Sequence, residues 1–173
     1  RVSPPPLVTL TTDFGTRDPY VAAMKGIIAS LCPHCAILDL THDIGPQDVM
    51  EAAMFVAASC RFFPQDTFHV VVVDPGVGSS RRAVAVRAGG QTFLCPDNGV
   101  LTCFLDECPS DEAYEIVESR FMRDVISRTF HGRDIFAPVA AHLARGVPMS
   151  QLGPPVKDLI RLDVARVRHE GGR

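Results

Sequence analysis

The sequence predicts an α/β fold, with a mainly parallel sheet that is flanked by helices on both faces. Two observations lead to this fold class. Apolar, strand-like runs alternate along the chain with segments of helical periodicity, which is the order of a parallel sheet with crossover helices. One run, residues 70–73, consists of four consecutive valines. A strand without a polar side is buried on both faces, so helices should cover this sheet above and below.

The first half of the chain contains three predicted strands and two predicted helices. In chain order they are a strand at 7–10, a helix at 20–31, a buried strand at 36–40, a helix at 47–63 and a buried strand at 70–73. Pro33 and Pro64 end the two helices, because proline has no N–H to donate and disfavours the helical conformation before it. Right-handed crossovers between the parallel strands follow from this order.

The second half adds a hairpin and two further helices. In chain order they are strands at 83–87 and 92–95, a helix that starts over 100–105, and a helix at 134–145. Gly89 and Gly90 form the turn of the hairpin, and Gly146 ends the last helix. This hairpin should join the parallel sheet.

Length and charge favour one globular domain. The chain has 173 residues, for which we expect a single domain (1–173) with a core at about 7–153 and a polar tail to 173. A net charge of −3 indicates neither a nucleic-acid partner nor an anionic membrane surface. No apolar run reaches the length of a membrane span. We therefore expect a cytoplasmic protein.

The six cysteines are expected to be structural. Cys32 and Cys35 have the spacing of a zinc knuckle, but a zinc site usually needs two such pairs, so we expect no metal. Cys60, Cys95 and Cys103 lie in apolar surroundings, where a free thiol behaves as a small hydrophobic side chain. Such usage fits a reducing compartment.

Aspartates follow the predicted strands in a repeated pattern: Asp13, Asp43, Asp74 and Asp97 each stand just after one. The carboxyl ends of parallel strands share one edge of a sheet, where α/β folds bind ligands. We therefore expect these carboxylates to converge. Any single aspartate could equally be a turn or capping residue, and only the repetition favours a site.

Two segments carry chemistry beyond this pattern. Asp74 is followed by a glycine-rich loop that ends in Arg81, so a carboxylate and a fixed positive charge stand near one strand end. His131 lies directly before the last predicted helix. Together with Asp74 and Arg81 it could form a base whose protonation is set by its neighbours.

The chain resembles a known enzyme family in five segments, which read TTDFGTRDPYVAAMKG, DLTHDIGPQDV, VDPGVGSSRR, PDNGVLT and TFHGRDIFAPVAAHLA. The family is that of the S-adenosyl-L-methionine (SAM) hydrolases (adenosine-forming), or SAM hydroxide adenosyltransferases, relatives of the fluorinases and chlorinases. The resemblance runs from about residue 7 to 153. It implies the three-layer N-terminal domain of that family, SAM as substrate, hydrolysis to adenosine and methionine, no cofactor, and a homotrimer.

The resemblance also implies roles for individual residues. The catalytic residues would be Asp74, Arg81 and His131, with Arg82 as the adjacent alternative to Arg81. Asp13 would bind the two ribose hydroxyls, and Asp18 and Tyr20 would lie near the methionine end. The remaining substrate-binding residues would be Asn98, Phe130 and Gly132. Asp18 could instead cap the helix that follows it, and Asn98 could be a turn residue.

The chain differs from related enzymes in residues of the site and in the domains that we expect. In the halogenases the aspartate of VDPG is a tyrosine and the histidine of TFHG is absent, whereas this chain has Asp74 and His131 and so favours water as the nucleophile. Gln47 stands where the fluorinase has an aromatic residue. The family also has a smaller β-rich C-terminal domain, which we expect to be absent here, with turnover weakened as a result.

Two other function classes stay open. One is a metal-dependent phosphoesterase that uses the strand-end aspartates with His42 and His131. The other is a non-catalytic domain that binds SAM or adenosine, or that serves assembly. Binding of SAM without turnover would indicate the second, and inhibition by EDTA the first.

Overall fold

The computed structural model describes residues 2–164, which contain a six-stranded sheet. The strands are β1 (Leu7–Thr12), β2 (Ala36–Thr41), β3 (Phe68–Val72), β4 (Ala83–Ala88), β5 (Gln91–Pro96) and β6 (Ser110–Glu115). Their spatial order is β2-β1-β3-β5-β4-β6. Neighbours pair in parallel except β4, which is antiparallel to both β5 and β6. The predicted mainly parallel sheet with a joined hairpin is confirmed.

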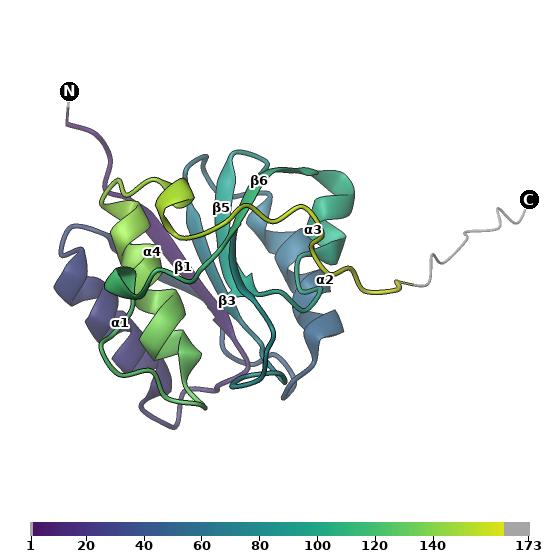
Figure 1. Cartoon of the computed structure of the whole chain (residues 1–173), viewed down its shortest axis with the longest axis horizontal. Coiled ribbons are helices and arrows are strands. Elements are labelled where there is room, and N and C mark those ends of the chain that lie inside the picture. Colours follow the sequence, from purple (N-terminus) through teal and green to yellow (C-terminus); the bar gives the residue numbers. More distant parts are fainter. Residues whose placement is uncertain (1, 165–173) are drawn as a thin grey trace, which may run out of the picture.

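Helices cover both faces of this sheet (Figure 1). On one face lie α1 (Tyr20–Leu31) and α4 (Ala137–Ala144), which contact each other, and on the other lie α2 (Val49–Cys60) and α3 (Thr102–Glu107). The valine run of β3 explains why two helical layers are needed. Val70 and Val72 belong to the core under α1 and α4, whereas Val71 and Val73 belong to the core under α2 and α3.

Some elements differ from the prediction. The predicted buried strand β2 is an edge strand and is largely exposed, with Leu38 46% accessible. The helix predicted from residue 134 begins earlier, as a π-helical turn, η2 (Gly132–Phe136), and continues as α4. Strand β6 was not predicted, because its sequence SDEAYE is typical of a solvated edge rather than of a buried strand.

The cysteines follow the prediction only in part. Cys60 and Cys95 are buried free thiols, and Cys103 is a half-buried one. Cys32 and Cys35 form a disulfide, a pairing that the sequence did not predict. The turn between α1 and β2 brings the two residues together, with their Cα atoms 5.5 Å apart.

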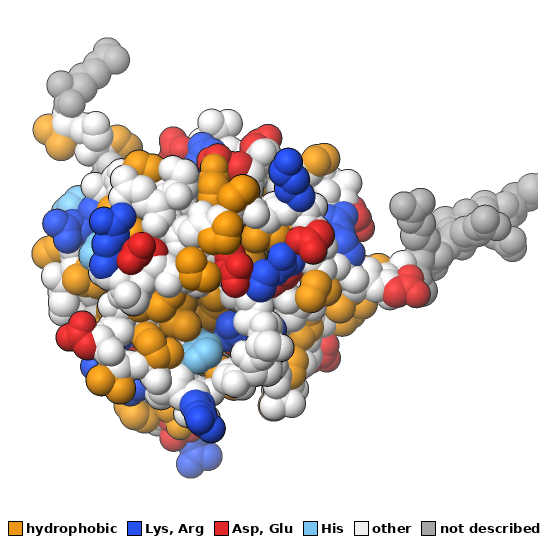
Figure 2. Space-filling view, viewed as in Figure 1, with side chains coloured by type: hydrophobic (Ala, Val, Ile, Leu, Met, Phe, Trp, Pro, Cys, Tyr) orange, Lys and Arg blue, Asp and Glu red, His pale blue; other side chains and the backbone are white. Residues whose placement is uncertain are grey.

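The end of the described chain returns across the sheet. After the short 3-10 helix η3 (Met149–Gln151), backbone N–H groups of residues 115 and 156 bond across to Pro154 and Ala113, which covers the outer edge of β6. Of the predicted polar tail, residues 165–173 lie outside the described residues. No described helix is long and apolar enough to span a membrane. Acidic and basic side chains are interspersed over the face shown in Figure 2.

Candidate active site

The order of the strands places a crevice between β1 and β3. The chain passes from β1 to β2 on one side and then to β3 on the other, so the topology switches direction between the carboxyl ends of β1 and β3. Ligands of α/β sheets bind at such a switch point. A cavity of about 160 Å³ lies here, lined by Asp13, Phe14, Gln47, Val72, Asp74, Val77, Thr129, His131 and Gly132.

Asp74 and His131 line this cavity, and Arg81 bonds to both, so the three side chains form one hydrogen-bonded group. The Arg81 Nε lies 3.0 Å from Asp74 Oδ1, and Arg81 Nη2 donates to Asp74 Oδ2. The same Nη2 lies 2.8 Å from His131 Nδ1. The Arg81 and Asp74 side chains are only 11% and 5% exposed, so solvent screens this pair weakly. The guanidinium thus bridges the carboxylate and the imidazole.

This geometry defines the state of His131. A guanidinium can only donate, so Nδ1 accepts and the proton of the neutral ring is on Nε2. Burial lowers the pKa of His131, and the positive charge of Arg81 lowers it further, against the opposing effects of Asp74, the Ser127 backbone and Asp134. The ring is therefore neutral at pH 7.

The loop before His131 is anchored by Asp134, a fully buried carboxylate in η2. It accepts hydrogen bonds from Arg133, Arg123 and the backbone N–H of Ser127, at 2.7, 3.0 and 2.8 Å. Burial alone would raise the pKa of Asp134, but these donors lower it to about 2. Asp134 therefore organises the loop that carries His131.

Asp13 lies in the same cavity, on the loop that follows β1. Its Oδ2 accepts a hydrogen bond of 2.7 Å from the backbone N–H of Gln47. Gln47 adopts a left-handed conformation, with φ of 61°, which turns this N–H toward the carboxylate. Asp13 keeps Oδ1 available to a ligand in the cavity.

The other two strand-end aspartates do not converge on this cavity, contrary to the prediction. Asp43 is exposed beyond β2. Asp97 is buried beyond β5, where its carboxylate binds Arg82 at 2.6 Å. Both follow strands that lie one position outward from the switch point, so only Asp13 and Asp74 face the crevice. The two neighbouring arginines therefore have different partners. Arg81 bonds to His131, which lines the cavity, whereas Arg82 bonds to Asp97, which does not.

The remaining predicted substrate-binding residues lie in different surroundings. Gly132 lines the cavity. Phe130 is buried and packs edge-on against Tyr20, with ring centroids 4.9 Å apart. Asp18 is exposed and does not cap α1, which has no side-chain cap. Asn98 donates to the Val73 carbonyl at 2.9 Å, so it holds a turn behind the site.

The structure also places residues in the cavity that the sequence interpretation did not single out as ligand-binding. Phe14, Val77 and Thr129 line it beside the predicted residues. Phe14 and Thr129 belong to the quoted segments around Asp13 and His131. Their closeness in sequence to these two residues could therefore have indicated that they line the cavity. Apolar wall residues carry no chemical signature of their own, which is why sequence reasoning passes over them.

No observation favours the metal-dependent alternative. His42 bonds through Nδ1 to Thr12 Oγ1 at 2.8 Å and through Nε2 to Asp39 at 2.8 Å, so both ring nitrogens already have protein partners. Within residues 2–164 there is no cluster of three or more His, Cys, Asp or Glu side chains that could hold a metal ion.

Comparisons with known proteins agree with this geometry. Residues 8–153 match the family described as SAM hydroxide adenosyltransferase N-terminal domain. The chain is 42% identical to an (R)-S-adenosyl-L-methionine hydrolase of Salinispora tropica, over 98% of this chain and 66% of that protein. It is 31% identical to a fluorinase of Actinoplanes, over 88% and 59% of the respective lengths.

A crystal structure from Thermotoga maritima has the same fold, with a TM-score of 0.88 and 39% identity. It covers 90% of this chain, which in turn covers 60% of that one. The chain thus spans about two thirds or less of the length of these relatives. The matched family model covers most of the chain, including both strand ends that form the cavity. This chain therefore belongs to the family of the SAM hydroxide adenosyltransferase N-terminal domain.

Proposed function

We propose that this protein hydrolyses SAM to adenosine and L-methionine. The observation that carries the proposal is the Asp74–Arg81–His131 group, which faces Asp13 in one cavity at the switch point of the sheet. Relatives at 42% identity are named (R)-S-adenosyl-L-methionine hydrolases. A site with a carboxylate acceptor and a neutral imidazole suits water as the nucleophile better than a halide ion, which such a carboxylate would repel.

In the proposed reaction the water oxygen forms a bond to the ribose 5′ carbon while the bond from that carbon to the sulfonium breaks. The electron pair of the broken bond stays on the methionine sulfur, which becomes neutral. One proton leaves the attacking water. We assign Asp74 to accept it and pass it to solvent, and Arg81 and His131 to hold the water in line with the carbon–sulfur bond.

Asp13 is the residue we assign to the ribose. An ionised carboxylate only accepts hydrogen bonds, so it can hold both hydroxyl groups of a ribose at once. Because these contacts exist in the bound substrate and in the transition state alike, Asp13→Ala should raise KM more than it lowers kcat.

We propose that the active form is a homotrimer in the cytoplasm. The cavity of about 160 Å³ is smaller than the roughly 300 Å³ or more of a typical small-molecule site, which supports a contribution from a second surface. The four free cysteines fit a reducing compartment, whereas the Cys32–Cys35 disulfide does not. Light scattering with and without SAM tests the assembly.

The deciding experiment is to incubate the protein with SAM and separate the nucleosides by chromatography, with and without chloride and EDTA. Adenosine and methionine in equal amounts, unaffected by either addition, are expected. A chloride-dependent 5′-chloronucleoside would instead indicate halogenation, and loss of activity with EDTA would indicate a metal enzyme. If there is no turnover while SAM still raises the melting temperature, the chain only binds SAM.

Two variants test the assigned roles. Asp74→Asn should lower kcat roughly 100-fold, since a general-base group typically contributes about 10² to 10⁴. His131→Ala should lower kcat by a similar factor, because a misplaced attacking water costs about 10² in rate. Both should keep the circular dichroism spectrum of the parent. Unchanged turnover in both variants would contradict the assignment.

A further inference from the structure

Two adjacent arginines separate just before β4. Arg81 enters the cavity group with Asp74 and His131, whereas Arg82 binds carboxylates on the other side of the chain. Successive side chains of an extended chain point to opposite sides, so the orientation of one residue constrains the other. Whatever anchors Arg82 therefore also defines the direction in which Arg81 leaves the backbone.

Arg82 is held from two elements. Its Nε and Nη2 bind Asp97 Oδ2 at 3.0 and 2.6 Å, and its Nη1 and Nη2 bind Asp158 Oδ1 and the Asp158 carbonyl at 2.9 and 3.0 Å. The Asp97 backbone N–H also donates to the Arg82 carbonyl at 2.9 Å. The Asp97 side chain is only 3% exposed, whereas the Arg82 side chain is 28% exposed. Both the side chain and the backbone of Arg82 are thus fixed.

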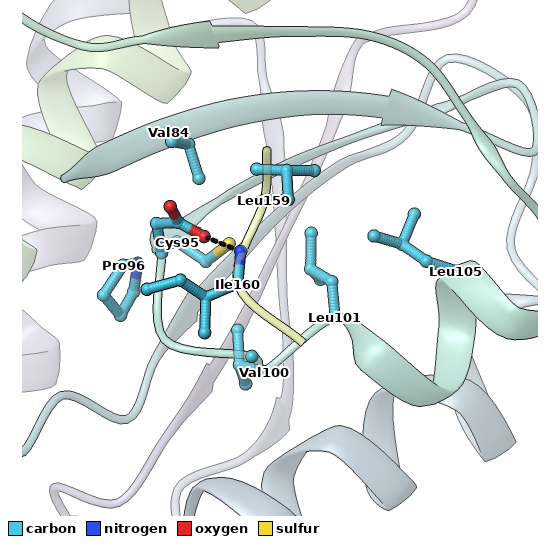
Figure 3. A pocket seen from close by; sticks show the side chains of 10 residues that line it. Val84, Cys95, Pro96, Val100, Leu101, Leu105, Leu159 and Ile160 are labelled. Atoms are coloured by element: carbon cyan, nitrogen blue, oxygen red, sulfur yellow. Dashed lines mark hydrogen bonds between the residues drawn. The ribbon is translucent and has the colours of Figure 1, made fainter. Parts of the chain in front are cut away.

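The second anchor lies on a segment that we call the strap, residues 157–162. Figure 3 shows its Leu159 and Ile160 among apolar side chains from β5 and the start of α3. The Ile160 N–H donates to Asp97 Oδ1 at 2.9 Å, so the two Asp97 oxygens hold the strap and Arg82 respectively. The space between these side chains is about 10 Å³, so at most one water molecule fits between the strap and the residues below it.

The same turn supports the carboxylate side of the cavity group. Asn98, next to Asp97, donates to the carbonyl of Val73, the residue before Asp74. Behind Gly99, a Cβ atom would lie 2.6 Å from Leu162 Cγ, so the strap closes directly over the turn. The turn at residues 96–99 thus contacts the chain on both sides of the Asp74–Arg81 pair.

We propose that Arg82 is a positioning residue, which Asp97 and the strap clamp so that Arg81 reaches Asp74 and His131 together. The kinetic consequences rest on the proposed SAM hydrolysis, but the positioning itself does not. Residues 157–162 thereby support the hydrogen-bonded group of Asp74, Arg81 and His131 without lining the cavity. Arg82 does not line the cavity, and its role is exerted through Arg81.

The direct test is an NMR titration of His131 in the ligand-free protein, because the charge of Arg81 lowers the pKa of this ring. His131 faces Arg81 and Asp74 from the β3–β4 loop, Asp134 from η2 and Asp13 across the cavity, and none of these is altered in an Arg82 variant. In Arg82→Gln we expect the pKa of His131 to rise, since Arg81 is no longer held beside it.

Matched variants separate positioning from stability. Arg87→Gln removes an arginine inside β4, which pairs with the exposed Asp66 at 2.9 Å, and should leave the His131 titration and kcat unchanged. Arg82→Lys keeps the charge but cannot bind two carboxylates as a fork, so it should restore the parent behaviour only in part. Asp158→Ala changes an 84% exposed side chain and should shift the titration in the same direction without unfolding.

In kinetics, Arg82→Gln should lower kcat roughly 10- to 100-fold with KM unchanged, because a small misplacement of a reacting group costs about that much. An unchanged His131 titration in both Arg82→Gln and Asp158→Ala would overturn the proposal, whether or not SAM is hydrolysed. If Arg82→Gln does not fold, Asp158→Ala alone decides. A parent protein without turnover contradicts the proposed function but leaves the titration decisive.

Discussion

At the scale of residues, the hydrogen-bonding partners of an ionisable side chain determine whether it can contact a ligand or only stabilises the fold. His131 and His69 are both histidines with a lowered pKa. His131 lines the cavity, whereas His69 is completely buried in β3. There its Nδ1 accepts from Thr9 at 2.6 Å and its Nε2 donates to Gln91, so the neutral ring is fully satisfied. Only His131 is available to a ligand.

His69 predicts how stability depends on pH. Burial lowers its pKa to about 4 although the bond to Gln91 raises it, while the unfolded chain titrates near 6.5. Between these values the unfolded state binds more protons, so the free energy of unfolding falls as the pH falls from 7 to 4, by about 3 kcal/mol from this residue.

Urea unfolding of the parent and of His69→Gln, at pH 7 and pH 4, measures this contribution. Glutamine does not titrate, and all carboxylates and other histidines are common to both proteins. The loss of stability between the two pH values should therefore be smaller in the variant by about 3 kcal/mol. Equal losses in the two proteins would show that His69 is not the responsible group.

At the scale of elements, the site depends on the contact between two loops. Gly78, in the loop after β3, has φ of +77°, and a Cβ atom there would lie 2.4 Å from the Arg128 carbonyl oxygen. Arg128 belongs to the loop that Asp134 anchors before His131. Since backbone cannot yield as a side chain does, a glycine is required where the two loops meet. This contact keeps Arg81 and His131 within hydrogen-bonding distance.

Gly78→Ala should therefore separate the loops and lower kcat roughly 10- to 100-fold. The matched control is Gly146→Ala after α4, where φ is +103° but nothing lies within 4 Å of the added Cβ. An alanine there also strains the backbone, because φ is positive, but it meets no neighbouring atom. A thermal melt and an activity assay on both proteins measure the two effects. Similar activity in the two variants would mean that the contact between the loops is unimportant.

Sequence patterns predicted the positions of helices and strands better than they predicted which of these elements are buried. The helix Tyr20–Leu31 begins and ends where its apolar periodicity and Pro33 predict. The strand at 36–40 was predicted to be buried because it contains apolar residues. These residues do not reveal its place at the edge of the sheet, and the strand is largely exposed. The π-helical start of η2 was not predicted either, and its Asp134 bonds to Arg123 and Ser127 in the preceding loop, contacts that local periodicity does not reveal.

At the scale of the whole molecule, the two helical layers are joined through a single sheet, and the disulfide lies at its rim. Cys32 ends α1 and Cys35 precedes the edge strand β2. A bridge over so short a separation restricts the unfolded chain only slightly and should contribute about 2 kcal/mol. It lies outside the residues that line the cavity.

Thiol titration under denaturing conditions tests this arrangement. Without reductant four of the six cysteines should react, and after reduction all six. Reduction should lower the free energy of unfolding by about 2 kcal/mol and leave SAM turnover intact. Cys108→Ser, which changes a free thiol, should lower the count before reduction to three. Six reactive thiols without reductant would show that the bridge does not form in solution.

Local sequence patterns predict the fold class, five of the six strands of the sheet, and the residues at the strand ends. These follow from local periodicity and from proline and glycine, which act within a few residues of their own position. Which strand ends meet depends on the tertiary structure. Asp13 and Asp74 share a cavity while Asp43 and Asp97 do not, because the order of the strands is set by long-range pairing. The distinct partners of Arg81 and Arg82 have the same origin, since they come from segments far away in the sequence.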